Sequence, residues 1–267
     1  MEFFFLVLAG ILGGFIAGLV GIGTGIIMLA IIPMVLPNYG VKPDDLVTYT
    51  VANTIFATMC SALVNIFTVL RQGNMQWKKS LLVSLAATLT AIFVFETFVK
   101  SDYYSKTLFN SIVILLLIVI IYRTIKKLRI ERHKPERSNT TKLSLAGASA
   151  GALAALTGLG GGAVLMPMLN LWLRMDIIKA RNISFVTIFS IATVLSVINL
   201  FGNSPDASVN AQGLIIYQLI LPISIGVVIG SPLGVLSGNR VKPKTITVLF
   251  LLITSLVLLR KIMELAG

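Results

Sequence analysis

The chain has 267 residues, of which 56% are hydrophobic and only 12% are charged, and its mean hydropathy is +0.94. A soluble domain carries about a quarter charged residues, so this composition excludes an ordinary soluble protein and indicates an integral membrane protein. The net charge of +12 does not indicate nucleic-acid binding, because Lys and Arg in membrane proteins mark cytoplasmic loops and contact anionic lipid.

Eight apolar segments follow one another along the chain. We expect them at residues 3–36, 46–70, 79–99, 107–125, 143–173, 183–201, 213–237 and 245–265. A basic stretch divides them into a first transmembrane repeat (1–125), a linker (126–142) and a second transmembrane repeat (143–267). Basic loops stay in the cytoplasm, so the linker is predicted to be cytoplasmic. The sequence thus predicts an all-α integral membrane protein of two homologous four-segment repeats, with about eight to ten crossings.

The first segment contains the glycine-rich run Gly18 to Gly25. As one helix this segment would be about 50 Å long, against a hydrocarbon core of about 30 Å. Glycine costs roughly 1 kcal/mol more than alanine in a helix, so the helix is expected to break at this run. The fifth segment contains a matching run, Ala155 to Gly162, and is expected to break there. Broken helices survive in a bilayer only where they face protein, water or a ligand, so two matched breaks are typical of a transporter site.

The two halves align over long stretches. Phe15–Met28 matches Ala152–Leu165 in the pattern of small and apolar residues. Leu46–Phe67 matches Ala180–Phe201 without a gap. We interpret this as an internal duplication.

Loop charges indicate that the halves have opposite orientations. The loop after the second segment contains Arg71, Lys78 and Lys79, whereas its counterpart at 202–212 has no basic residue. Opposite orientation requires segments one and five to be paired spans or re-entrant hairpins. The alternative is eight simple spans with parallel halves and long tilted first helices.

A substrate site is expected at the two breaks and at the polar starts of segments two and six. The candidate residues are Gly21, Gly23, Thr24, Gly25, Thr50, Asn53, Gly158, Gly160, Gly161, Gly162, Arg181, Asn182, Ser184 and Thr187. No Lys or Arg lies at mid-depth, so backbone N–H groups at helix starts are expected to supply positive potential, with Arg181 approaching from the edge. The alternative is a kink without a ligand, lined by ordinary interhelical hydrogen bonds.

Other motifs favour structural roles or exclude chemistry. Glycines spaced by four, at 10, 14 and 18 and again at 226, 230, 234 and 238, are typical of close helix packing. Glu96, four residues before Lys100, is interpreted as an interfacial carboxylate rather than a proton carrier. Cys60 is interpreted as a packing residue and His133 as a solvated linker residue. With no paired carboxylates, Ser/His arrangement or Cys/His cluster, the sequence predicts no enzyme, no catalytic residue, no metal and no cofactor.

These motifs together resemble the sulfite exporter TauE/SafE family of permeases. Gly158–Pro167 is similar to its GxGGGxxxxP signature, and Arg71–Asn74 to its Arg-Gly-Asn turn. The glycine-spaced segment seven followed by Arg240 is also similar. The first run departs from the pattern, because Thr24 replaces a glycine and the proline falls at Pro33. The resemblance implies export or uptake of sulfite, thiosulfate or organosulfonates, without fixing which one.

The resulting hypothesis is a multi-pass secondary transporter, or permease, that moves a small sulfur-containing oxyanion across the cell membrane, in the direction of export and by alternating access. No phosphate-binding loop is present, so ATP is not expected to drive it directly. The alternatives are a passive anion pore and a transporter of another small anion. The expected partners are the anion, membrane lipid, a proton or sodium as coupling ion and a second copy in a homodimer, and no nucleic acid.

Overall fold

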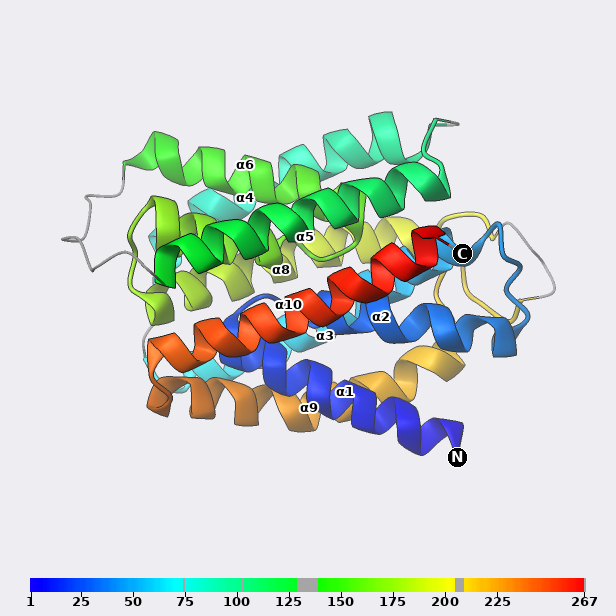
Figure 1. Ribbon diagram of the computed structural model, residues 1–267, viewed down its shortest axis with the longest axis horizontal. Helices are drawn as coiled ribbons and strands as arrows, with labels where there is room; N and C mark the ends of the chain where they lie inside the picture. The colour runs from blue at the N-terminus through cyan, green and yellow to red at the C-terminus, as the bar shows by residue number, and fades with distance from the viewer. Residues whose placement is uncertain (74, 102, 129–138, 205–208, 267) are drawn as a thin grey trace.

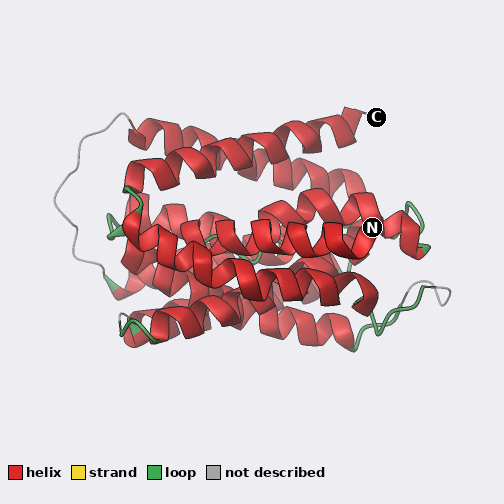
Figure 2. Cartoon of the chain, turned by 90° about the horizontal axis from the view of Figure 1, so that it is seen from below, coloured by secondary structure: helices red, strands yellow, loops and turns green. Residues whose placement is uncertain are grey.

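The computed structural model describes residues 1–73, 75–101, 103–128, 139–204 and 209–266, and within these ranges it contains helices and no β-strands (Figures 1 and 2). Seven of the described helices are long and apolar enough to cross a membrane. The prediction of an all-α, multi-pass membrane protein is therefore confirmed. Most of the predicted linker, including His133, lies outside the described residues.

The first half contains five α-helices and two short continuations. These are α1 (Glu2–Val20), α2 (Gly25–Val35) with the 3₁₀ turn η1 (Leu36–Tyr39), α3 (Leu46–Leu70), α4 (Trp77–Val94) with the π-helical turn η2 (Phe95–Val99), and α5 (Lys106–Leu128).

The second half also has five α-helices in the described residues, but only one short continuation. These are α6 (Thr140–Thr157), α7 (Gly162–Pro167) with the π-helical turn η3 (Met168–Trp172), α8 (Ile177–Leu200), α9 (Tyr217–Arg240) and α10 (Pro243–Ala266).

Both glycine runs break the helix in which they lie. α1 ends at Gly21 with a φ of 85°, and α6 ends at Gly158 with a φ of 67°. These angles lie in the left-handed region, which glycine adopts without the Cβ clash that other residues meet. The predicted breaks therefore occur where the sequence placed them, and each leaves a short helix, α2 or α7, after it.

Close contact between glycine faces joins the two halves. A Cβ atom built at Gly230 of α9 would overlap the backbone carbonyl of Ile11 in α1. One built at Gly151 of α6 would likewise overlap the carbonyl of Ala87 in α4. Only glycine allows backbones to approach this closely, so the spaced glycines act in helix packing, as predicted.

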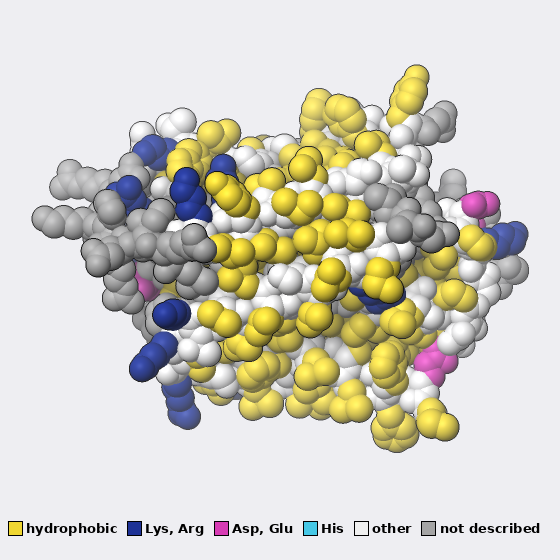
Figure 3. Space-filling model, viewed as in Figure 1, with side chains coloured by type: hydrophobic (Ala, Val, Ile, Leu, Met, Phe, Trp, Pro, Cys, Tyr) yellow, Lys and Arg dark blue, Asp and Glu magenta, His cyan; other side chains and the backbone are white. Residues whose placement is uncertain are grey.

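The two chain termini lie at the same end of the molecule, and the end of α5 and the start of α6 lie at the other (Figure 1). We call these the terminus end and the linker end. Most Lys and Arg side chains in Figure 3 gather at the linker end, and a broad apolar surface separates the two ends. Because basic ends stay in the cytoplasm, the linker end is expected to be cytoplasmic. The inverted relation between the halves stays a prediction.

Cysteine labelling tests this orientation in a Cys60→Ala background. Tyr103→Cys lies in the loop before α5 at the terminus end, where the tyrosine is 89% exposed. Lys244→Cys lies at the start of α10, at the linker end. We expect an impermeant maleimide to label position 103 in intact cells and position 244 only after permeabilisation. The reverse pattern would contradict the orientation.

The glycine contact predicts a position-specific cost in stability. Gly230→Ala should lower the free energy of unfolding by about 1–3 kcal/mol, because its methyl group has no room beside Ile11. Gly202→Ala is the control, since the nearest atom to its Cβ would be 3.4 Å away. Thermal unfolding in detergent measures both variants, and equal melting temperatures would show that the contact is unimportant.

Candidate functional site

The two glycine breaks meet in the core of the molecule, although they come from different halves. A Cβ at Gly25 would lie 2.9 Å from the Cα of Leu159, and one at Gly162 would lie 2.7 Å from the carbonyl carbon of Ile22. Gly23 and Gly160 also share neighbours, because both contact Thr58 of α3 and Ile188 of α8. Since all ten residues of Gly21–Gly25 and Gly158–Gly162 are buried, the breaks form one central, closely packed unit.

Hydroxyl groups of α3 and α8 hold the first break in place. Ser184 donates through Oγ to the backbone oxygen of Gly21 at 2.8 Å. The Oγ1 atoms of Thr24 and Thr58 lie 3.1 Å apart in a hydrogen bond. No side chain caps the start of α2, whose first backbone N–H groups have no partner within the helix. The start of α2 thus places the positive end of a helix dipole at the break.

Arg181 of α8 packs directly against the first break. Only 2% of its surface is exposed, and a Cβ at Gly21 would lie 2.5 Å from its Cγ. Its Nη2 donates to Oδ1 of Asn239 at 2.5 Å, and its Nη1 donates to the backbone oxygen of Leu19 at 3.5 Å. Asn239 in turn donates to Oε1 of Gln72 at 2.8 Å.

The guanidinium of Arg181 has no carboxylate partner within 4 Å in the described part of the chain. Its Nε is buried and makes no hydrogen bond there. Asp176, at the start of α8, instead caps that helix by accepting from the N–H groups of Ile178 and Lys179. Asp176 thus attracts the guanidinium only from beyond pairing distance. A buried cation without a directly paired counter-charge costs several kcal/mol, so this site favours an anion.

Three further residues predicted for the site are buried in this conformation, and two of them form hydrogen bonds within or between helices and loops. Asn53 donates to the backbone oxygens of Tyr49 and Leu214 and accepts from the N–H of Ile216, which holds the segment before α9. Thr187 donates to the backbone oxygen of Ile183 and accepts from Ser84. Asn182 is buried beside Arg181.

Thr50 does not lie at the breaks, but lines a separate cavity between α3 and α10. Glu96 lies at the surface, where it is 45% exposed and pairs with Lys100 at 2.7 Å, in agreement with an interfacial carboxylate. The described residues contain no cluster of His, Cys, Asp or Glu that could hold a metal ion.

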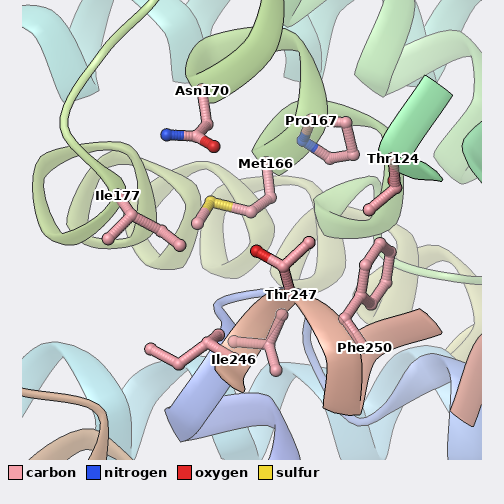
Figure 4. A pocket seen from close by; sticks show the side chains of 9 residues that line it. Thr124, Met166, Pro167, Asn170, Ile177, Ile246, Thr247 and Phe250 are labelled. Atoms are coloured by element: carbon pink, nitrogen blue, oxygen red, sulfur yellow. The ribbon is translucent and has the colours of Figure 1, made fainter. Parts of the chain in front are cut away.

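A small pocket opens beside the first break, toward the linker end. Its lining residues are Val20, Thr124, Met166, Pro167, Asn170, Ile177, Ile246, Thr247 and Phe250. Figure 4 shows the side chains of Met166, Asn170 and Thr247 pointing toward one another across it. Its surface is mainly apolar. Thr124 donates to the backbone oxygen of Ile120, and Asn170 donates to that of Met175. The pocket thus borders the site without adding charge to it.

Residues outside the sequence prediction complete the site. Thr58 and Ile188 contact both breaks, and Asn239 and Gln72 bind or support the guanidinium of Arg181. Gln72 belongs to the turn that resembles a family motif, and Asn239 precedes Arg240, but neither position indicates a contact with Arg181. Their roles depend on how α3, α8 and α9 are rotated against one another.

Comparison with known proteins agrees with this architecture. The family profile described as sulfite exporter TauE/SafE matches residues 6–260. A probable membrane transporter protein of Methanocaldococcus jannaschii is 21% identical over 244 residues, which cover 91% of this chain and 89% of that protein. A probable membrane transporter protein of Haemophilus influenzae is 23% identical over 232 residues, covering 84% and 82%. No solved structure matches the chain.

The resemblance seen in the glycine signature thus extends over nearly the whole chain, and it agrees with the helical, multi-pass structure. The protein belongs to the sulfite exporter TauE/SafE family of membrane transporters.

Proposed function

We propose that the protein is a secondary transporter of a small sulfur-containing oxyanion, such as sulfite, thiosulfate or an organosulfonate, and that the glycine breaks with Arg181 bind it. The observation that carries the proposal is the buried Arg181, which has hydrogen bonds to neutral groups but no carboxylate within 4 Å among the residues that the structure describes. An oxyanion with several acceptor oxygens suits a guanidinium, because its planar N–H groups can bind two oxygens at once.

The neutral remainder of the site suits transport rather than permanent binding. Arg181 itself contacts Asn239 and the backbone oxygen of Leu19, and the first break beside it carries the hydroxyls of Ser184 and Thr24 and the start of α2. Such groups orient an anion without adding further full charges, so the anion can also leave. Binding that is too strong would slow release on the other side of the membrane.

The close packing of the breaks fits a mechanism of alternating access. Gly25 and Gly162 contact the opposite break, and Gly23 and Gly160 contact α3 and α8. A movement of one half against the other would separate these contacts and open the site first to one side and then to the other. We propose export as the direction and a proton or sodium gradient as the driving force.

Arg181 provides a direct test of substrate binding. Arg181→Gln should lower the rate of oxyanion flux into proteoliposomes on the order of tenfold or more, because the buried charge is lost. Arg181→Lys should retain part of the activity, since it keeps the charge but loses the bidentate geometry. Flux should be measured for sulfite, thiosulfate, an alkyl sulfonate, sulfate and chloride, with and without pH and sodium gradients.

Asn239→Asp tests the same idea without removing the arginine. The new carboxylate would lie where Oδ1 now accepts from Arg181, so an internal ion pair should compete with the substrate and reduce flux on the order of tenfold. Asn203→Asp, at an exposed position of the opposite end, is the matched control. If Asn239→Asp folds and transports as well as Asn203→Asp, Arg181 is not the anion ligand. Flux without saturation would instead indicate a passive pore.

The glycines themselves are a less selective test. Gly160 and Gly161 both have positive φ, and a Cβ at Gly160 would lie 2.6 Å from Cγ2 of Thr58. Leucine at either position would therefore strain the fold as well as fill the site, and loss of transport would not separate the two effects.

A further inference from the structure

A second cavity, of about 160 Å³, lies toward the terminus end of the molecule. It lies between α2, α3, α5 and the last turns of α10, and its lining residues are Pro33, Leu46, Val47, Thr50, Phe109, Asn110, Arg260 and Lys261. None of these residues belongs to the glycine breaks, and only Thr50 was among the candidates from the sequence.

Lys261 is buried in this cavity, with 3% of its surface exposed. Its Nζ lies 5.4 Å from the ring centroid of Phe109, in a cation–π contact. A lysine near the end of a membrane helix usually extends its ammonium toward water, because burial of the charge is costly. Here the side chain instead lines the cavity together with Arg260, so two basic side chains line one space.

Two neutral polar atoms in the same cavity have no hydrogen-bond partner among the described residues. They are Oγ1 of Thr50 and Oδ1 of Asn110, and both residues are 2% exposed. Buried polar atoms without partners are rare in folded proteins and often mark a missing ligand or water. The threonine hydroxyl can donate to an anion, and the asparagine amide can do so after rotation about its terminal bond.

The other half of the chain offers an internal comparison. If α5 and α10 are aligned at their first residues, Lys106 and Pro243, Asn110 corresponds to Thr247 and Lys261 to Thr124. These counterparts line the pocket of Figure 4, beside the first break. Thr124 there donates to the backbone of its own helix, at 2.6 Å from the oxygen of Ile120. The counterpart position therefore holds a neutral residue, so a cation at this place is particular to the second half.

We propose that the terminus-end cavity is a second anion site, which binds an oxyanion group through Lys261 and Arg260 and orients it through Thr50 and Asn110. A free sulfur oxyanion and the phosphate of a lipid headgroup share this chemistry. The identity of the free anion rests on the proposed transport function, but the site itself does not.

Binding to the purified protein tests the site independently of transport. Calorimetric titrations with sulfite, and separately with short-chain phosphatidylglycerol, should be made on the unmodified protein and on Lys261→Gln, Lys261→Arg and Thr50→Val. Lys100→Gln is the charge-matched control, because this lysine is exposed at the same end and pairs only with Glu96 in the described part of the chain. Repeating the titrations in the Arg181→Gln background isolates this site from the glycine breaks.

We expect Lys261→Gln to weaken anion binding at least tenfold and Thr50→Val to weaken it several-fold, while Lys261→Arg and Lys100→Gln retain it. If Lys261→Gln and Thr50→Val bind sulfite more weakly than the unmodified protein, the site binds a free anion. If they bind the lipid more weakly, the site binds a headgroup. If Lys261→Gln does not fold, Thr50→Val decides, since it leaves both cations in place. Wild-type binding of both ligands to the folded variants would overturn the proposal. Intact anion binding in a protein that transports no oxyanion would instead overturn only the transport function.

Discussion

The structure depends on one requirement: where two helices break inside an apolar protein, the exposed backbone N–H and C=O groups need hydrogen-bond partners or enclosure by protein. Lipid offers no hydrogen bonds, so the residues around Gly21 and Gly158 must be enclosed by protein. The breaks achieve this by packing on each other and on the middle of α3 and α8, where Ser184 donates to the backbone of Gly21. The close glycine contacts of α1 with α9 and of α6 with α4 hold the arms of both broken helices in position.

Among the described residues, two buried cations lie in this largely apolar core. Arg181 lies beside the first break and binds Asn239, and Lys261 lies in a cavity near the terminus end. We propose that each of them belongs to an anion-binding site, and the closely packed breaks lie beside the first of these sites. Described hydroxyl and amide groups lie near each cation: Asn239 binds Arg181, and Thr50 and Asn110 line the cavity of Lys261. The Lys and Arg side chains that gather at the linker end in Figure 3 indicate orientation in the membrane and are separate from these two sites.

Several features follow from local sequence alone and were predictable. The low helix propensity of glycine and its ability to adopt left-handed φ angles act within short segments. The ends of α1 and α6 therefore agree with the prediction. Apolar length placed the long spans to within about six residues, the largest difference being the start of α8, and α6 (Thr140–Thr157) is not among the seven long candidate spans. The signature Gly158–Pro167, together with the turn Arg71–Asn74 and the glycine-spaced segment seven, indicated the family, which the match over residues 6–260 confirms.

The sequence by itself thus determined the membrane class, the helical segments, the breaks and the family. Only the tertiary structure decided which side chains meet: Arg181 with Asn239, Thr58 with both breaks, Asn53 with the segment before α9, and Lys261 with Thr50 in one cavity. A helix in an apolar environment has weak sequence periodicity, because nearly every face is hydrophobic. Its rotation is therefore set by close packing against partners distant in the chain, and that information is absent from any single segment.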